Sequence, residues 1–151
     1  MAGQQSFDAQ VGDWVAQTKE RLEAVFKESA QRTISLMVKY TPVDTGFLRA
    51  SVRASTSAMP KIIPTAKGGG VNVPYDSGAV LMTIAGAKLG QTIYVGYTAN
   101  YARHVEYGTS KMAARRFVGR AASQWQRTVR QVSADLQKRA GAGQANPLRP
   151  R

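Results

Sequence analysis

The sequence contains no cysteine and only one histidine, His104. The chain therefore has no disulfide, thiolate nucleophile or cysteine metal site, and one histidine cannot form the histidine cluster of a zinc site. There is also no apolar run approaching the ~18 residues of a membrane span, and no leading basic-then-apolar segment. We therefore expect no cofactor, no metal and no membrane partner, and a chain that stays in the cytosol.

Acidic residues are scarce, and most scarce towards the C-terminus. Nine Asp and Glu stand against 21 Lys and Arg, which gives a net charge of +12. Residues 1–40 are neutral, residues 41–114 carry +4 and residues 115–151 carry +8. This gradient is typical of a surface that meets a polyanion or acidic partners, although a solvated basic surface is the simpler alternative.

Length and composition suit one compact domain, because 151 residues with 43% hydrophobic content can bury only a modest core. We place this domain at residues 1–140. Residues 141–151 combine glycine and proline with Arg149 and Arg151, which predicts a flexible basic tail. The same composition suits an arm that orders on a neighbouring subunit.

Apolar and small side chains recur every three or four residues from residue 7 to residue 40. At about 100° per residue they share one side of a helix. Ser6 is a suitable N-cap, and Thr41-Pro42 ends the helix because proline disfavours helical geometry in the residue before it. We predict one helix of roughly 50 Å, packed in part on the sheet and in part on another subunit, with core packing as the simpler account of each residue. The stripe consists of Phe7, Val11, Trp14, Val15, Thr18, Leu22, Val25, Phe26, Ser29, Thr33, Leu36 and Tyr40.

The middle of the chain is the strand region. Ala50–Ser57 and Gln91–Tyr97 contain the β-branched and aromatic residues that strands favour, and Val80–Ile84 is a third candidate. Between them, a long loop at about residues 58–79 holds three prolines and the run Gly68–Gly70. Loops of this length are usually functional or disordered. Our hypothesis is that this one orders on a neighbouring subunit during assembly.

Two catalytic interpretations fail on chemistry. A phosphate-binding loop needs a lysine and a hydroxyl residue directly after its glycines, whereas Val71–Pro74 follows here. His104, Glu106 and Ser110 share one short segment, and no nucleophile elbow or oxyanion site is visible. A lone histidine beside tyrosines is far more often a packing residue.

The last helix carries the clearest charge pattern. We predict it from Arg115 to about Ala140, with its apolar residues on one face and five cations within about 80° of one another on the other face. The cations are Arg116, Arg120, Arg127, Arg130 and Lys138. Asp135 is the only acid in this helix, and the guanidinium fork suits phosphate, so this face is a candidate DNA-facing or partner-facing surface. A solvated face is the alternative.

Two motifs resemble the tail-component family of long-tailed bacteriophages. The first is Pro42–Gly46, followed by Leu48 and Ser51, where Asp44 can cap the turn and Gly46 can take a positive φ. The second is Tyr94–Gly96, followed by Tyr101-Ala102 and then by Val105–Thr109. Arg115 and Phe117 match the arginine and phenylalanine that usually follow in the family, whereas Ala113 and Arg116 stand where it often has proline. The resemblance covers about residues 41–119.

The resemblance implies an α+β fold with a long N-terminal helix, a small antiparallel sheet with a long loop, and a C-terminal amphipathic helix. It implies a structural virion protein of the head–tail junction, similar in role to minor tail protein Z of phage lambda. Such a protein is not an enzyme. It is assembled in the host cytoplasm into a ring, six-fold by the symmetry of tails, whose partners are further copies of itself, neighbouring neck and tail proteins, and duplex DNA in the lumen.

The motif residues have two readings, as builders of turns and core or as subunit contacts. Glu106 with Arg103 or Arg115 is a candidate ion pair, within one subunit or between two. The candidate fold and interface residues are Asp44, Gly46, Leu48, Arg49, Arg103, Glu106, Tyr107, Gly108, Arg115 and Phe117.

Alternative functions stay open from the sequence. The protein could be the tail terminator rather than a completion protein. A stand-alone small basic DNA-binding protein would explain the charge but not the two motifs, and no helix-turn-helix or aromatic single-strand platform is visible. An enzyme ranks third.

Overall fold

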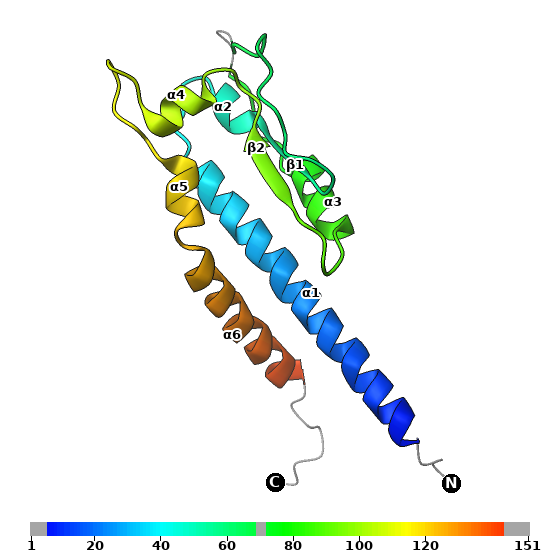
Figure 1. Ribbon diagram of the computed structural model, residues 1–151. Coiled ribbons are helices and arrows are strands. Elements are labelled where there is room, and N and C mark those ends of the chain that lie inside the picture. The colour runs from blue at the N-terminus through cyan, green and yellow to red at the C-terminus, as the bar shows by residue number, and fades with distance from the viewer. Residues whose placement is uncertain (1–5, 69–71, 144–151) are drawn as a thin grey trace.

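A computed structural model describes residues 6–68 and 72–143 of the chain. The fold is α+β, as predicted, with a long N-terminal helix, a two-stranded antiparallel sheet and C-terminal helices (Figure 1). No helix among the described residues is long and apolar enough to cross a membrane. The elements in chain order are α1 (Phe7–Tyr40), α2 (Phe47–Ala50), β1 (Val52–Ser55), α3 (Gly78–Gly86), β2 (Tyr94–Tyr97), α4 (Ala102–Tyr107), α5 (Phe117–Ala122) and α6 (Trp125–Gly143).

The predicted N-terminal helix is confirmed at both ends. The Ser6 hydroxyl accepts the N–H of Ala9 at 3.3 Å, which satisfies one of the free donors that every helix start exposes. At the other end, the N–H of Thr41 donates to the carbonyls of Met37 and Val38, and Pro42 then follows in a non-helical conformation. Proline therefore stops the helix where the sequence predicts.

The sheet has two strands, each shorter than its predicted range. β1 and β2 pair antiparallel, with Val52 opposite Tyr97 and Ser55 opposite Tyr94. The contact continues one step further, because the N–H and the hydroxyl of Thr98 both donate to the Ser51 carbonyl at 3.0 Å. The chain before β1 forms the short helix α2, which the sequence did not indicate.

The third predicted strand, Val80–Ile84, is wrong, because these residues lie in helix α3. Val80 and Ile84 are four residues apart, so they share a helix face, and each is only 3% exposed. The carboxylate of Asp76 accepts the N–H of Gly78 at 2.8 Å at the start of this helix. Periodicity alone cannot separate a short buried strand from a short buried helix.

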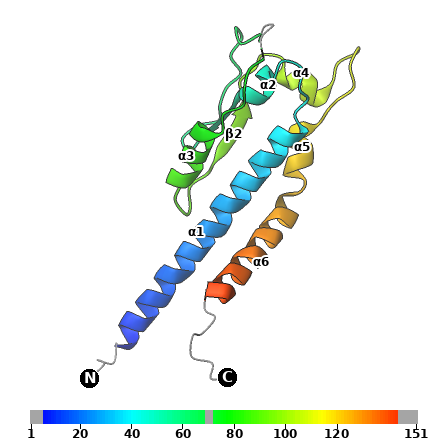
Figure 2. The same cartoon turned by 180° about the vertical axis from the view of Figure 1, so that it is seen from behind.

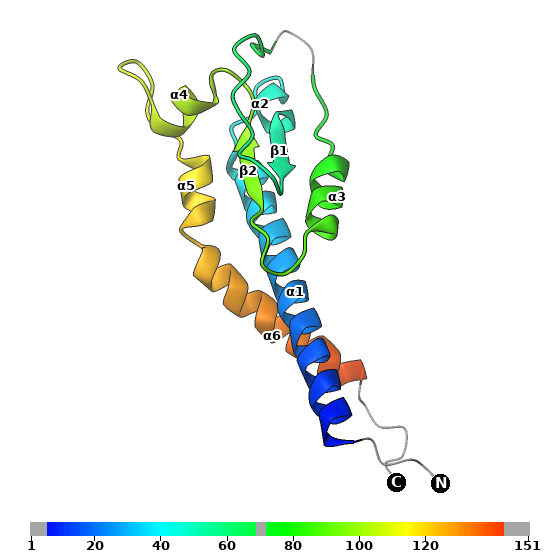
Figure 3. The same cartoon turned by 45° about the vertical axis from the view of Figure 1, so that its right-hand side comes forward.

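Helix α1 lies between two layers. α5 and α6 pack along one side of it, while the sheet and α3 lie together on the other (Figures 1 and 2). Figure 3 shows the sheet over the C-terminal part of α1, with α3 beside it. The core therefore gathers around the C-terminal half of α1, where residues of every layer are buried: Ile34, Met37, Leu48, Val52, Val80, Ile84, Tyr97, Ala99, Ala102, Phe117 and Ala121.

The predicted single C-terminal helix is interrupted, and this corrects the sequence interpretation. α5 ends at Ala122 and α6 begins at Trp125. The Arg120 carbonyl accepts from the Ser123 hydroxyl at 2.9 Å and from the Gln124 side-chain amide at 3.2 Å, while the Gln124 N–H turns to the Ala121 carbonyl. Side chains thus take the place of a backbone helix bond, which is how serine and similar residues disturb helices.

The predicted long loop is present, since no helix or strand occurs in its described residues between β1 and α3. Its backbone is bonded to the rest of the fold. The Ile63 N–H donates to the Thr98 carbonyl at 2.9 Å, and the Asn100 N–H donates to the Ala66 carbonyl at 3.0 Å. Gly69 and Gly70 fall outside the described residues, as does the predicted tail from residue 144 onward, while Gly141–Gly143 end α6.

Candidate functional site

The two sequence motifs converge on one groove. The turn between α1 and α2 lines one wall with Pro42–Leu48, and α4 with the following loop lines the other with Tyr101, Val105 and Arg115. The groove encloses about 590 Å³, and Lys67 adds a second cation to its wall. Phe47 and Tyr101 both line it, and their ring centroids lie 6.4 Å apart. Segments more than fifty residues apart in the sequence therefore form one surface.

Gly46 takes the positive φ that the sequence predicts, at 81°. A Cβ at this position would lie 2.5 Å from the Val73 carbonyl oxygen, so both conformation and space require glycine. The Val73 N–H also donates to the Thr45 carbonyl at 2.8 Å, which fastens the long loop to the turn. The cap expected from Asp44 is made by Thr45 instead, whose hydroxyl accepts the Phe47 N–H at 3.4 Å.

Glu106 caps a helix, and the ion pair predicted within a subunit is wrong. Its two carboxylate oxygens each accept one backbone N–H at 2.9 Å, Oε2 from Val118 and Oε1 from Gly119. The residue is only 8% exposed and forms no ion pair with Arg103 or Arg115 in the described chain. The start of α5 supplies the compensating positive end of the helix dipole.

Two residues with positive φ shape the hairpin from α4 to α5. Gly108, at φ 79°, ends α4, and a Cβ there would lie 2.7 Å from the Ala114 nitrogen. Arg116, at φ 46°, directly precedes α5, and its N–H donates to the Glu106 carbonyl at 3.1 Å. Proline fixes φ near −65°, so a proline at this position could not adopt this conformation.

A buried hydroxyl pair ties α1 to the sheet beneath Phe117. The hydroxyls of Tyr97 and Thr41 lie 2.6 Å apart, and the ring of Tyr97 meets that of Phe117 edge to face at 4.9 Å. Burial raises the pKa of Tyr97 to about 12, against the smaller opposing effect of the Thr41 hydrogen bond. Phe117 is 1% exposed, so its role is in the core.

The remaining motif residues divide between core and surface. Leu48 is 5% exposed and belongs to the core, and Arg49 is half-buried with its Nε unpartnered. Asp44, Arg103 and Arg115 are exposed, and Tyr107 is 66% exposed. The motifs thus combine residues that build the fold with residues left free for contact.

The five predicted cations of the C-terminal region are all exposed, and none forms an ion pair within the described residues. Arg127, Arg130 and Lys138 share one face of α6, within about 80° at 100° per residue. The break after Ala122 separates Arg116 and Arg120 from them. The Arg120 guanidinium lies 4.2 Å from the centroid of the Tyr40 ring, so this cation also packs against α1.

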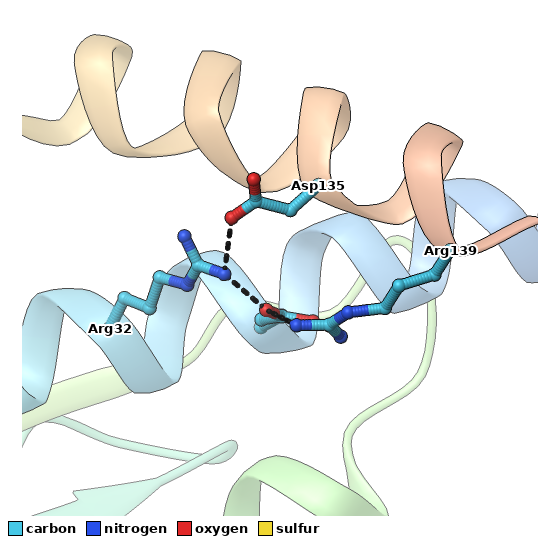
Figure 4. A network of polar contacts seen from close by, with 4 residues as sticks. Arg32, Asp135 and Arg139 are labelled. Carbon is cyan, nitrogen blue, oxygen red and sulfur yellow. Dashed lines mark hydrogen bonds and ion pairs between the residues drawn. The ribbon is translucent and has the colours of Figure 1, made fainter. Parts of the chain in front are cut away.

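A charged network that the sequence analysis missed holds α6 against α1 (Figure 4). Arg32 contacts Glu28 at 2.6 Å and Asp135 at 2.8 Å, and Arg139 contacts Glu28 at 3.2 Å. The hydrogen bond from Arg32 lowers the pKa of Asp135. The pKa of Arg32 is raised, mainly by its hydrogen bond to Asp135 and next by that to Glu28. Glu28 and Arg32, four residues apart, were the available sequence signal.

Replacing Glu106 by glutamine should lower the free energy of unfolding by about 1–3 kcal/mol, because the amide NH₂ would face a backbone donor and leave it unsatisfied. Urea denaturation of the purified protein measures this loss. Glu20→Gln makes the same chemical change at an exposed site on α1 and should stay within about 0.5 kcal/mol of the unchanged protein. Equal stabilities of the two variants would contradict the capping role.

Stability should fall in acid through Asp135. Because Arg32 lowers the pKa of this carboxyl below its ordinary value of 3.8, the contribution is present above that pH and is lost as the pH falls through the folded-state pKa. Between pH 5 and pH 2.5, the unfolding temperature Tm should fall more steeply for the unchanged protein than for Asp135→Asn. Asp13→Asn, at an exposed carboxylate of α1, should keep the steeper decline.

Comparison with known proteins assigns the chain to a family. A family model described as "Bacteriophage HK97-gp10, putative tail-component" matches residues 5–108. This range contains α1, the sheet and both motifs up to Gly108, whereas Arg115, Phe117 and the helices α5 and α6 follow it. Searches among curated proteins and among solved structures gave no match. Because the family model covers more than two thirds of the chain, this protein belongs to the HK97-gp10-like family of bacteriophage tail components.

Proposed function

We propose that the protein is a structural part of the virion at the head–tail junction, where it forms a ring that joins the DNA-filled head to the tail. Membership of a tail-component family supports a structural rather than a catalytic role. The observation that carries the proposal further is the basic face of α6, because a ring at this joint encloses the path of the DNA.

The exposed cations suit duplex DNA. Arg127, Arg130 and Lys138 are exposed and form no ion pair within the described residues, and Asp135 is bonded to Arg32 instead. Unneutralised like charges on one helix face repel one another unless anions lie nearby. Phosphates that pass through a ring would supply those anions without any need for base recognition.

We assign the subunit contacts to those motif residues that are exposed. Arg103 and Tyr107 belong to α4, which projects from the body together with the loop that leads to α5 (Figure 1). Tyr107 is 66% exposed, and tyrosine is enriched at protein interfaces, so its exposed ring suits a subunit contact. Glu106 is already bonded to the start of α5, so contacts of this region would use Arg103 and Tyr107 instead of Glu106.

Electron microscopy of lysates from a phage that lacks this protein tests the assignment. We expect DNA-filled heads beside separate, complete tails, because the joint cannot form. Supplying the unchanged protein in trans should restore joined particles. Tails of irregular length would assign the protein as the terminator, and intact infectious particles would overturn the structural role in favour of a stand-alone DNA-binding protein.

Charge removal tests the DNA contact separately. Binding of a short duplex by the assembled protein should weaken with salt, and the triple variant Arg127→Gln, Arg130→Gln, Lys138→Gln should reduce the slope of log K against log[salt] by about 3. Lys39→Gln, Lys88→Gln and Lys111→Gln together remove equal charge at exposed sites elsewhere and should change the slope by less than about 1. Equal effects of the two triple variants would show that net charge, rather than α6, binds the DNA.

A further inference from the structure

The N-terminal half of α1 is left uncovered by the rest of the described chain. From residue 7 to residue 22, here called the arm, every side chain is exposed except that of Thr18, which is half-buried. The three ribbon views agree that this part of α1 runs past the ends of α3 and α6 (Figures 1, 2 and 3). At 1.5 Å per residue the arm is about 24 Å long.

The arm carries an apolar stripe that no described residue covers. Phe7 is 78% exposed and Trp14 is 68% exposed, and three further members follow the same side of the helix within about 100°. These three are Val11 at 42%, Val15 at 37% and Leu22 at 52%. A contiguous apolar strip of this kind marks an interaction site.

The stripe continues a face that is already used for packing. Further along α1, Arg32 forms an ion pair with Asp135 of α6, and the Tyr40 hydroxyl accepts a hydrogen bond from the side chain of Gln124, just before α6. At 100° per residue Arg32 and Tyr40 point within the same sector as Phe7 and Leu22. The arm thus extends a helix-packing surface beyond the point where its own α6 ends, so its occupant should be a further layer of protein.

Charge favours a second copy of this chain as that occupant. The arm holds three acidic and two basic side chains, which gives it a net charge of −1. Because the whole chain carries +12, the residues outside the arm carry +13. The outer residues 7–18 hold Asp8 and Asp13 and no cation at all. We call the residues outside the arm the body. Two arms side by side would bring like charges together, whereas an arm that lies on the body of another copy joins opposite charges.

The body offers a surface of matching chemistry. Met59, Ile62 and Ile63 of the long loop are 55%, 43% and 49% exposed, and Lys61 stands among them. No acidic residue occurs between Asp44 and Asp76. These exposed apolar side chains beside a lysine complement the outer part of the arm, where Asp8 borders the apolar stripe and no cation occurs between residues 7 and 18.

We propose that the arm of one copy docks, stripe inward, on the body of a second copy. The contact joins different surfaces of the two subunits, and repeated contacts of this kind close into rings when the rotation permits. Its extension to a closed ring rests on the proposed function, whereas the docking contact itself does not.

Trp14→Glu tests the contact, with Ala16→Glu as its matched control. Both variants add one carboxylate to the same helical turn, but residue 16 lies about 160° away from residue 14 around the helix. Light scattering over a series of concentrations should show that Trp14→Glu raises the concentration for half-assembly at least about 30-fold, while Ala16→Glu changes it less than about 3-fold. Circular dichroism should show both variants folded, because the arm lies outside the core. Equal assembly of both variants would overturn the proposal, as would an unchanged protein that stays monomeric at every concentration.

A photo-crosslinker at position 14 identifies the occupant directly. The expected product has twice the mass of one chain and joins the arm to a peptide of the body between residues 41 and 140. A product that joins position 14 to another arm would overturn the docking mode. Joined heads and tails in phage that carry Trp14→Glu, together with loss of joining in the deletion phage, would leave the proposed function intact while rejecting a need for the arm.

Discussion

The buried carboxylate of Glu106 sets the path of the chain between the two layers around α1. A helix start leaves backbone N–H groups without partners, and two of those of α5 are met by this one side chain. The bond requires α4 to end close to the start of α5, so the hairpin must close within nine residues. Gly119 completes the arrangement, because a Cβ there would already lie 3.2 Å from Glu106 Oε1. Phe117, two residues before Gly119, is thereby placed in the core.

This constraint links the motif residues to packing rather than to chemistry. Phe117 meets Tyr97 edge to face, and Tyr97 shares a hydroxyl contact with Thr41 at the end of α1. The end of the long helix, the second strand and the last layer are thereby joined through three neighbouring side chains. The exposed residues of the same motifs, Arg103 and Tyr107, remain outside this set and can serve contacts without disturbing it.

Sequence reasoning predicted those features whose causes are local. The limits of α1 followed from a serine cap and a proline, and the positive φ of Gly46 followed from its turn. Features that depend on distant partners were missed. Val80–Ile84 suited a strand until burial on one helix face decided otherwise, and the role of Glu106 depended on N–H groups twelve and thirteen residues further on. The break before Trp125 arose from competition for one carbonyl, which no periodicity records.

The central position of α1 has a consequence for biosynthesis. Its C-terminal half is completed by α6 through Glu28–Arg139 and Arg32–Asp135, contacts that span more than one hundred residues of sequence. Distant contacts of this kind form late because a long loop must close first. Because α1 leaves the ribosome long before α6, it waits for α6 with its apolar face open to other chains in the meantime. Subunits that emerge near one another on the same message can meet at that stage, so folding and association would compete for the same helix.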